Sequence, residues 1–216
     1  MKKFAVVLAG CGVYDGAEIH EATLSLWAIM KHGAEYEVFA PDKPQMHVVN
    51  HLTGQVSGET RNVLVESARI ARGRIRPLED YDPAGFDALL MPGGFGVAKN
   101  LCDFAVKGDA MSVDPQVERA LRATAAAGKP IGALCIAPVI LSRLFGEVRL
   151  TLGQDPGAAS AVERMGSRHV MTTHGDVVTD ERHKIFTTPC YMLDANILQI
   201  AEGAENIVKA ILASLR

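Results

Sequence analysis

The chain has 216 residues, of which 48% are hydrophobic and 22% are charged, a balance that provides a buried core and excludes a disordered chain. Its length predicts one domain over residues 1–216 rather than two small ones. The net charge of −3 offers no basic surface for nucleic acid or an anionic membrane. No apolar run reaches the length of a membrane span, so we expect neither nucleic acid nor membrane as a partner.

The cysteines predict free thiols. Cys11, Cys102, Cys135 and Cys190 form neither a close pair nor a zinc-binding spacing. The apolar start at residues 4–9 is too short for a signal peptide and predicts a first strand instead. Since unpaired thiols are typical of a reducing compartment, we expect a cytoplasmic protein.

Short apolar runs alternate with amphipathic segments in the first half of the chain. Residues 4–8, 35–40 and 88–91 predict buried strands. Residues 18–32 have helical spacing, with Gly33 as the residue that ends the helix, and residues 61–72 predict a second helix. The loops at residues 41–60 and 102–113 are long enough to cover a site.

The same alternation continues to the C-terminus. Asp114 and Pro115 are expected to cap a helix through residue 127, and residues 131–134 predict a strand followed by a helix at 136–144. Further strands are expected at residues 149–152, 169–171 and 184–187, and a long helix at 193–215. Alternating strands and helices predict an α/β fold, a mostly parallel sheet covered by helices on both faces.

Cys135 is the strongest candidate for a reactive residue. It stands in residues 132–138 (GALCIAP), where an apolar strand runs directly into a helix. A sharp turn between strand and helix exposes its central side chain, and the small residues Gly132 and Ala137 leave room for that turn. Because a helix start favours a thiolate, we expect a lowered pKa for Cys135.

A glycine-rich loop at residues 91–96 (MPGGFG) follows the preceding strand. Its flexible backbone, at Gly93 and Gly94, can turn N–H groups toward an anion. Together with the amide of Ile136, these groups are candidates for an oxyanion hole. Both loops should lie at the same edge of the sheet, which supports one shared site.

Two acidic residues, Glu18 and Glu21, open the first helix at the same sheet edge. Three positions apart, they share a helix face, and either could exchange a proton with a nearby thiol. Acidic residues are common in any first helical turn, so spacing alone does not favour catalysis. No histidine stands in a catalytic motif, and no metal-binding pattern is present, so we expect no metal and no cofactor.

Several motifs together resemble the ElbB group of the ThiJ/PfpI superfamily, whose fold is that of the class I glutamine amidotransferases. The resemblance covers nearly the whole chain. It rests on residues 10–16 (GCGVYDG), 18–21 (EIHE), 39–43 (FAPDK), 50–54 (NHLTG), 59–64 (ETRNVL), 92–96 (PGGFG), 99–101 (KNL), 135–138 (CIAP) and 187–189 (TTP).

This resemblance implies a three-layer, flavodoxin-like α/β/α sandwich and a nucleophilic Cys135. The superfamily's glutamate falls on Glu21, with Glu18 one turn earlier, and the amides of Gly94 and Ile136 would hold an oxyanion. The implied activity is that of a cofactor-independent, weak glyoxalase III-type lyase, which converts glyoxal or a similar 2-oxoaldehyde to a hydroxy acid such as glycolate. A small aldehyde is the implied substrate and a homodimer the implied assembly.

The chain departs from the superfamily after the helix that follows Cys135. Residues 150–155 (LTLGQD) contain no histidine where many members have one, and the amidotransferase pattern of a downstream His-x-Glu pair is absent. Glutaminase activity is therefore the least favoured of three hypotheses. The second is a non-catalytic role, in which Cys135 senses oxidants or the pocket binds a metabolite and regulates a pathway. The name of the ElbB group implies isoprenoid synthesis as that pathway.

Overall fold

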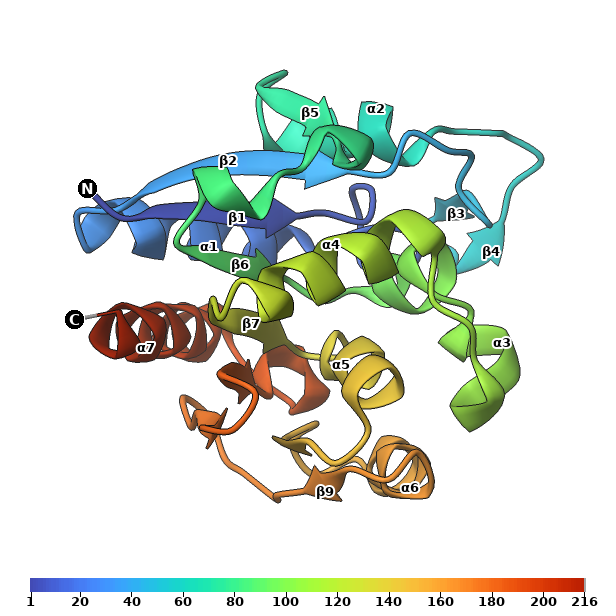
Figure 1. Ribbon diagram of the computed structural model, residues 1–216. Helices are drawn as coiled ribbons and strands as arrows, with labels where there is room; N and C mark the ends of the chain where they lie inside the picture. Colours follow the sequence, from blue (N-terminus) through green and yellow to red (C-terminus); the bar gives the residue numbers. More distant parts are fainter. Residues whose placement is uncertain (216) are drawn as a thin grey trace.

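The computed structural model describes residues 1–215, and Figure 1 shows them as a central sheet between layers of helices. Across the seven-stranded sheet the order is β10 (Val178–Asp180), β11 (Ile185–Thr188), β7 (Ile131–Leu134), β6 (Ala88–Met91), β1 (Lys3–Val7), β2 (Glu35–Ala40) and β5 (Ile75–Pro77). Every neighbouring pair is parallel except β10 with β11. The predicted mostly parallel α/β/α sandwich is confirmed.

The central strands match the prediction and the edges do not. The strands at residues 35–40, 88–91 and 131–134 were predicted with their observed bounds. The edge strands β5 and β10 were missed, because three residues are too few to show a period. The expected strands at 149–152 and 169–171 lie outside the main sheet. They form β8 (Arg149–Leu150) and β9 (Arg168–His169), which pair with each other around an unpredicted helix, α6 (Pro156–Arg164).

Helices cover both faces of the sheet. On one face lie α1 (Ile19–Lys31) and α7 (Ile197–Ser214), together with α2 (Val63–Ile70) near the β5 edge. The other face is covered by α4 (Pro115–Ala126) and α5 (Pro138–Phe145). The first of the two long loops expected from the sequence contains the hairpin of β3 (Val49–Asn50) and β4 (Gln55–Val56), and the second contains the single turn α3 (Phe104–Lys107) and a 3-10 turn at Gly108–Ala110.

Capping residues fix several helix ends. Asp114 caps α4 by accepting hydrogen bonds from the backbone N–H groups of Gln116 and Val117, at 2.9 and 3.4 Å, as predicted. Gly33 follows α1 with φ of +72°, as expected of a residue that ends a helix. The last helix starts at residue 197 rather than 193, because Asn196 and Gln199 form a capping box there.

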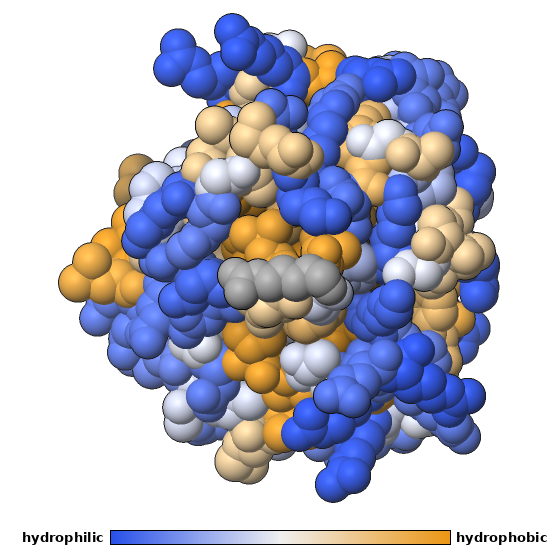
Figure 2. Space-filling view, turned by 60° about the vertical axis from the view of Figure 1, so that its left-hand side comes forward, coloured by the Kyte–Doolittle hydropathy of each residue, from blue (hydrophilic) through white to orange (hydrophobic). Residues whose placement is uncertain are grey.

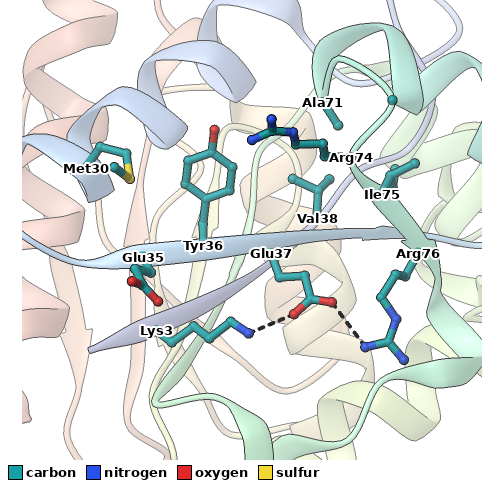
Figure 3. Close-up of a pocket in the computed structure, with 11 residues that line it drawn as sticks. Lys3, Met30, Glu35, Tyr36, Glu37, Val38, Ala71, Arg74, Ile75 and Arg76 are labelled. Atoms are coloured by element: carbon teal, nitrogen blue, oxygen red, sulfur yellow. Dashed lines mark hydrogen bonds and ion pairs between the residues drawn. The ribbon is translucent and has the colours of Figure 1, made fainter. Parts of the chain in front are cut away.

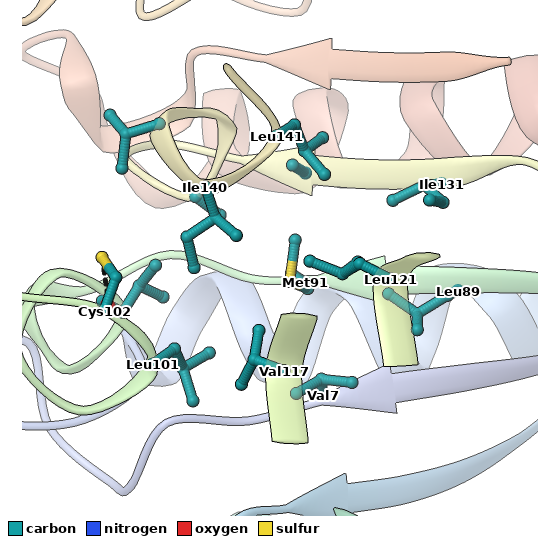
Figure 4. Close-up of a cluster of buried hydrophobic side chains, with 14 of the residues drawn as sticks. Val7, Leu89, Met91, Leu101, Cys102, Val117, Leu121, Ile131, Ile140 and Leu141 are labelled. Carbon is teal, nitrogen blue, oxygen red and sulfur yellow. Dashed lines mark hydrogen bonds between the residues drawn. The ribbon is translucent and has the colours of Figure 1, made fainter. Parts of the chain in front are cut away.

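The five central strands are hydrophobic on both faces, so each contributes to two clusters of buried side chains. In β1, Phe4 and Val6 point toward α1 and α7, whereas Ala5 and Val7 point toward α4 and α5. Figure 4 shows part of the second cluster, where side chains of the sheet meet those of α4 and α5. A fully buried side chain of this size contributes about 1.5–3 kcal/mol, which explains the strict alternation.

The chain changes direction between β1 and β6, which are neighbours in the sheet. From β1 it proceeds to β2 and β5 on one side, and then returns through β6 to β7 and β11 on the other. In parallel sheets a ligand crevice forms at the carboxyl ends of the strands beside such a switch point. The loops after β1, β6 and β7, which carry the predicted site residues, all leave the sheet at that edge.

The opposite edge of the sheet carries both ends of the described chain (Figure 1). Figure 2 views the molecule with this side turned forward and shows hydrophobic side chains between hydrophilic ones. A hollow of about 540 Å³ is lined there by Lys2, His32, Lys209, Leu212, Ala213 and Leu215. None of the predicted site residues lies in it. Among residues 1–215, no helix is both long and apolar enough to cross a bilayer.

Candidate active site

Cys135 occupies the sharp turn between β7 and α5. Its φ is +57°, a left-handed conformation that a side chain other than glycine adopts only under strain. The turn is held by backbone hydrogen bonds: Cys135 N–H donates to the Thr188 carbonyl, and Ala137 N–H to the Leu134 carbonyl, both at 3.0 Å. The predicted nucleophile elbow therefore has the expected backbone geometry. The helix itself starts at Pro138, two residues later than predicted.

Glu21 is the carboxylate next to Cys135. It projects from the first turn of α1 and is fully buried. One carboxylate oxygen accepts a hydrogen bond from Gly93 N–H at 2.9 Å and the other accepts from Tyr191 N–H at 3.1 Å. The Cys135 thiol also donates a hydrogen bond to this carboxylate. Burial, and next the repulsion from Glu18, raise the pKa of Glu21 to about 7.

The lowered pKa expected for Cys135 was wrong. Burial, and next the neighbouring Glu21, raise the pKa of the thiol well above its ordinary value. Backbone N–H groups of Gly94 and Ile136 donate to the sulphur and oppose this shift without overcoming it. The desolvation is large because only 7% of the Cys135 surface is exposed, and α5 starts three residues later, beyond the reach of most of its helix-start effect. At rest the thiol keeps its proton and needs a base.

Glu18 has a different position from Glu21. It is the N-cap of α1, and its side chain accepts a hydrogen bond from Glu21 N–H at 2.7 Å. Its own N–H donates to the Gly93 carbonyl at 2.9 Å, which ties the start of α1 to the glycine-rich loop. Glu18 still lines the cavity above Cys135. The structure therefore places Glu21 against the thiol and Glu18 at the cavity wall.

The two glycines after β6 allow close approach of three backbone segments. A Cβ added at Gly93 would lie 2.5 Å from the Cys135 Cβ and 2.8 Å from a Glu21 carboxylate oxygen. At Gly94, where φ is +100°, it would lie 2.4 Å from the Glu18 nitrogen and the Gly16 carbonyl. Of the three predicted oxyanion donors, Gly94 and Ile136 point their N–H groups at the sulphur. The Gly93 N–H is instead occupied by Glu21.

A cavity of about 440 Å³ opens above Cys135. Besides Cys135, Glu18, Gly94 and Ile136, it is lined by residues that sequence reasoning did not select: Val13, Phe95, Phe104, Asp155, Gly157, Ala158, Tyr191 and Met192. Val13 and Phe95 lie in the motifs at residues 10–16 and 92–96, whereas Phe104, Ala158 and Met192 come from segments far apart in the chain that no local pattern links to the site. For Tyr191, the nearest signal was the motif at residues 187–189, which precedes it.

The histidines do not complete a Cys–His pair. Among residues 1–215, none lines the cavity. His20 reaches its edge indirectly, with Nδ1 2.7 Å from the Tyr191 hydroxyl. His51 stacks on Tyr14, with ring centroids 4.9 Å apart, and His183 lies 3.1 Å from Asp180. The absence of a histidine beside Cys135 leaves Glu21 as the group positioned to accept its proton.

The other thiols lie in surroundings that favour the protonated form. Cys102 is buried and donates to the Val97 carbonyl at 3.2 Å, and burial raises its pKa to about 12. Burial also raises the pKa of Cys190 and of the half-buried Cys11. Within the described part of the chain, no three His, Cys, Asp or Glu side chains are grouped as a metal site would require.

A second cavity, of about 650 Å³, lies around the beginning of β2 (Figure 3). Glu37 there accepts hydrogen bonds from Lys3 at 2.8 Å and from Arg76 at 3.1 Å, while Tyr36 and Val38 project from the other side of the strand. This cavity is larger than the one above Cys135. It lies toward the amino ends of the strands and contains no nucleophile, so it offers no chemistry comparable to the Cys135–Glu21 pair.

Two curated relatives match almost the whole chain. One is the human glutamine amidotransferase-like class 1 domain-containing protein 3, mitochondrial, which is 44% identical over 97% of this chain and 82% of its own length. The other is the ES1 protein, mitochondrial, of Danio rerio, 34% identical over 96% of this chain and 84% of its own. No protein-family model matches the chain.

These names contradict the cytoplasmic location that we expected. Both relatives are named as mitochondrial proteins. The expectation rested on free thiols, which indicate reducing surroundings but do not distinguish one reducing compartment from another. Unpaired cysteines therefore do not indicate which reducing compartment holds the protein.

Solved structures support the same relationship. An isoprenoid biosynthesis protein with an amidotransferase-like domain from Ehrlichia chaffeensis has a TM-score of 0.94 and 36% identity, with all of both chains covered. A glyoxalase III from Candida albicans has a TM-score of 0.64 at 14% identity, over 99% of this chain and 97% of that one, a likeness that shows the fold alone. The chain therefore belongs to the ElbB group of the ThiJ/PfpI superfamily, with the class I glutamine amidotransferase-like fold.

Proposed function

We propose that this protein is a glutathione-independent glyoxalase-type lyase, which converts glyoxal or a similar small 2-oxoaldehyde to the corresponding hydroxy acid. The observation that carries the proposal is Cys135 at the floor of a cavity, hydrogen-bonded to the buried carboxylate of Glu21 behind it. A thiol and a carboxylate with a pKa of about 7 are the nucleophile and the proton carrier that this reaction needs. The name of the Candida albicans structure is consistent with this chemistry.

The first step forms a bond between sulphur and carbon. Glu21 accepts the thiol proton as the Cys135 Sγ attacks the aldehyde carbon, and it then passes that proton to the new alkoxide oxygen. The product is a hemithioacetal. The N–H groups of Gly94 and Ile136, which point at the sulphur in the free protein, stabilise negative charge as it moves from sulphur to oxygen.

The second step moves a proton between neighbouring carbons. The Glu21 carboxylate removes the C–H proton of the hemithioacetal, and the resulting enediol takes the proton back at the adjacent carbon. This gives a thioester of the hydroxy acid. Water then cleaves the thioester, which releases glycolate when glyoxal is the substrate and restores the thiol. The carboxylate of Glu18, at the cavity wall, is the alternative carrier for this proton.

The other two hypotheses receive less support from the site. An oxidant-sensing cysteine requires an accessible thiolate, whereas burial keeps the Cys135 thiol protonated. A glutaminase of this fold requires a histidine beside the cysteine, and none of residues 1–215 supplies one in the cavity.

The test is glycolate formation from glyoxal without glutathione or metal. We expect Cys135→Ala to abolish turnover and Glu21→Gln to reduce it by about 10²–10⁴-fold, the usual contribution of a positioned acid–base group. Cys11→Ser is the matched control, since it removes a half-exposed thiol that does not line the cavity. Turnover that persists in Cys135→Ala at the wild-type rate would sink the proposal. Loss of turnover in Glu18→Gln but not in Glu21→Gln would move the proton transfer to Glu18.

A further inference from the structure

The cavity above Cys135 has mostly apolar walls. Its apolar lining side chains come from segments far apart in the chain, and they surround the approach to the thiol. These side chains are Val13, Phe95, Phe104, Ile136, Ala158 and Met192. Binding energy in such a cavity comes from covering apolar ligand surface, at about 25 cal/mol per Å².

The charged side chains that line the cavity are all acidic. Glu18 lies at the wall and Asp155 at the exposed rim, and no Lys, Arg or His of residues 1–215 lines the space. Lys99 contacts the outer face of the region, 5.6 Å from the Phe95 ring centroid, but its ammonium donates to the Tyr14 carbonyl at 2.8 Å and does not line the cavity. An anionic group inside would face two carboxylates without a cation to pair with.

The cavity is also large for glyoxal. Its volume is about 440 Å³, within the range of sites for small organic ligands. Glyoxal consists of only two carbonyl groups and fills on the order of 100 Å³, taking the roughly 30 Å³ of one water molecule for each heavy atom. Most of the apolar wall would then remain in contact with water, and the positioning of the aldehyde against Cys135 would be poor.

From the size, the apolar walls and the acidic charge, we infer that the preferred substrate is a 2-oxoaldehyde with an apolar group of aryl size, neutral or cationic, and that anionic substrates are rejected. This inference rests on the proposed function for its chemistry and adds the class of substrate. The aldehyde reaches Cys135 at the floor, with Glu21 buried behind the thiol, the apolar group covers the walls, and a positive charge on that group lies toward Asp155.

The reaction balances for such a substrate. Phenylglyoxal adds its aldehyde carbon to the Cys135 sulphur, the C–H proton moves to the neighbouring carbon, and one water molecule cleaves the thioester to give mandelate. The internal proton shift oxidises one carbon and reduces the other, so no external oxidant or reductant is consumed. We expect kcat/KM for phenylglyoxal to exceed that for glyoxal by about 10- to 100-fold, as the burial of one ring predicts.

Charge on the ring provides the second comparison. We expect 4-carboxyphenylglyoxal to react at least about 10-fold less efficiently than phenylglyoxal, and a 4-aminomethyl derivative at least as well as phenylglyoxal. Asp155→Asn should reduce the difference in kcat/KM between the carboxylate and the aminomethyl substrates. The amide side chain can still cap α6, where Asp155 accepts from Ala158 N–H at 2.7 Å. Asp82→Asn is the matched control, because Asp82 caps a short turn outside the cavity and should leave this difference unchanged.

A binding measurement separates this inference from the proposed function. Calorimetric titration of the wild type uses acetophenone, 4-acetylbenzoate and 4-acetylbenzylamine, which cannot complete the reaction. Tighter binding of the neutral and cationic compounds than of the carboxylate, with protection of Cys135 from alkylation, supports the inference even if no aldehyde is turned over. Two results would overturn the inference about the substrate and leave glyoxalase activity intact. One is a kcat/KM for glyoxal at least as high as that for phenylglyoxal. The other is binding of 4-acetylbenzoate as tight as that of acetophenone and 4-acetylbenzylamine.

Discussion

The pairing of Cys135 with Glu21 concentrates the chemistry of the site in one buried hydrogen bond. Both groups lose hydration on folding, the charge of Glu18 further disfavours ionised Glu21, and Glu21 disfavours the Cys135 thiolate, so the pair retains protons at a pH where an exposed carboxylate would be ionised. Four backbone N–H groups beside the pair therefore favour its charged state: those of Gly93 and Tyr191 donate to the carboxylate, and those of Gly94 and Ile136 donate to the sulphur. The donors come from loops that the glycines keep close.

The pH dependence of turnover follows from this pair. Glu21 must be ionised to accept the thiol proton, so we expect kcat/KM to rise with pH through about 7, the raised pKa of Glu21. In Glu18→Gln the rise should move to lower pH, because repulsion from Glu18 is one cause of the raised pKa. The measurement is kcat/KM from pH 5 to 9. A flat wild-type profile over this range would contradict a role for Glu21 as the base.

The glycine-rich loop after β6 is the element that brings α1 against the elbow. Gly94→Ala would place a methyl group 2.4 Å from two backbone atoms, at a φ of +100° that alanine rarely adopts. We expect a loss of about 1–3 kcal/mol in the free energy of unfolding, together with lower turnover, since the loop must move away from Glu18. Urea denaturation measures the first effect.

Gly85→Ala is the matched control for this loop. A Cβ at Gly85 meets no atom within 4 Å, and its φ is not positive. Its free energy of unfolding should change by no more than about 0.5 kcal/mol. Equal losses in the free energy of unfolding in Gly94→Ala and Gly85→Ala would mean that the close approach at Gly94 does not constrain the loop.

At the scale of the whole molecule, the buried carboxylate makes stability depend on pH. The pKa of Glu21 rises from 4.5 to about 7 on folding, so the native state binds this proton more tightly than the unfolded state. The stability that this proton contributes is fully present below pH 4.5 and is lost as pH rises through 7, by about 3 kcal/mol at 1.36 kcal/mol per pKa unit.

Urea denaturation of the wild type and of Glu21→Gln at several pH values tests this dependence. The glutamine does not titrate, so the difference between the two unfolding free energies isolates Glu21. We expect the wild type to lose about 3 kcal/mol relative to Glu21→Gln between pH 4.5 and 8. A difference that stays constant with pH would show that Glu21 titrates at its ordinary pKa.

The homodimer and the single domain stay predictions of the sequence.

The sequence by itself determined the central strands, the helices that alternate with them, and Cys135 at a strand-to-helix turn. These features depend on local patterns: apolar runs, helical spacing, and residues such as Asp114 and Gly33 that mark helix ends. Short edge strands such as β5 and β10 lay beyond this reasoning, because their pairing partners are distant in the chain.

The tertiary structure alone decided which glutamate meets the thiol and what charge the pair carries. Glu18 and Glu21 stand on the same helix turn, and only the packing of α1 against the loops after β6 and β11 buries Glu21 beside Cys135. Burial and neighbouring charge set a pKa, and both are properties of the assembled fold. For the same reason the sequence indicated a lowered pKa for Cys135 from its helix start, whereas its surroundings raise it.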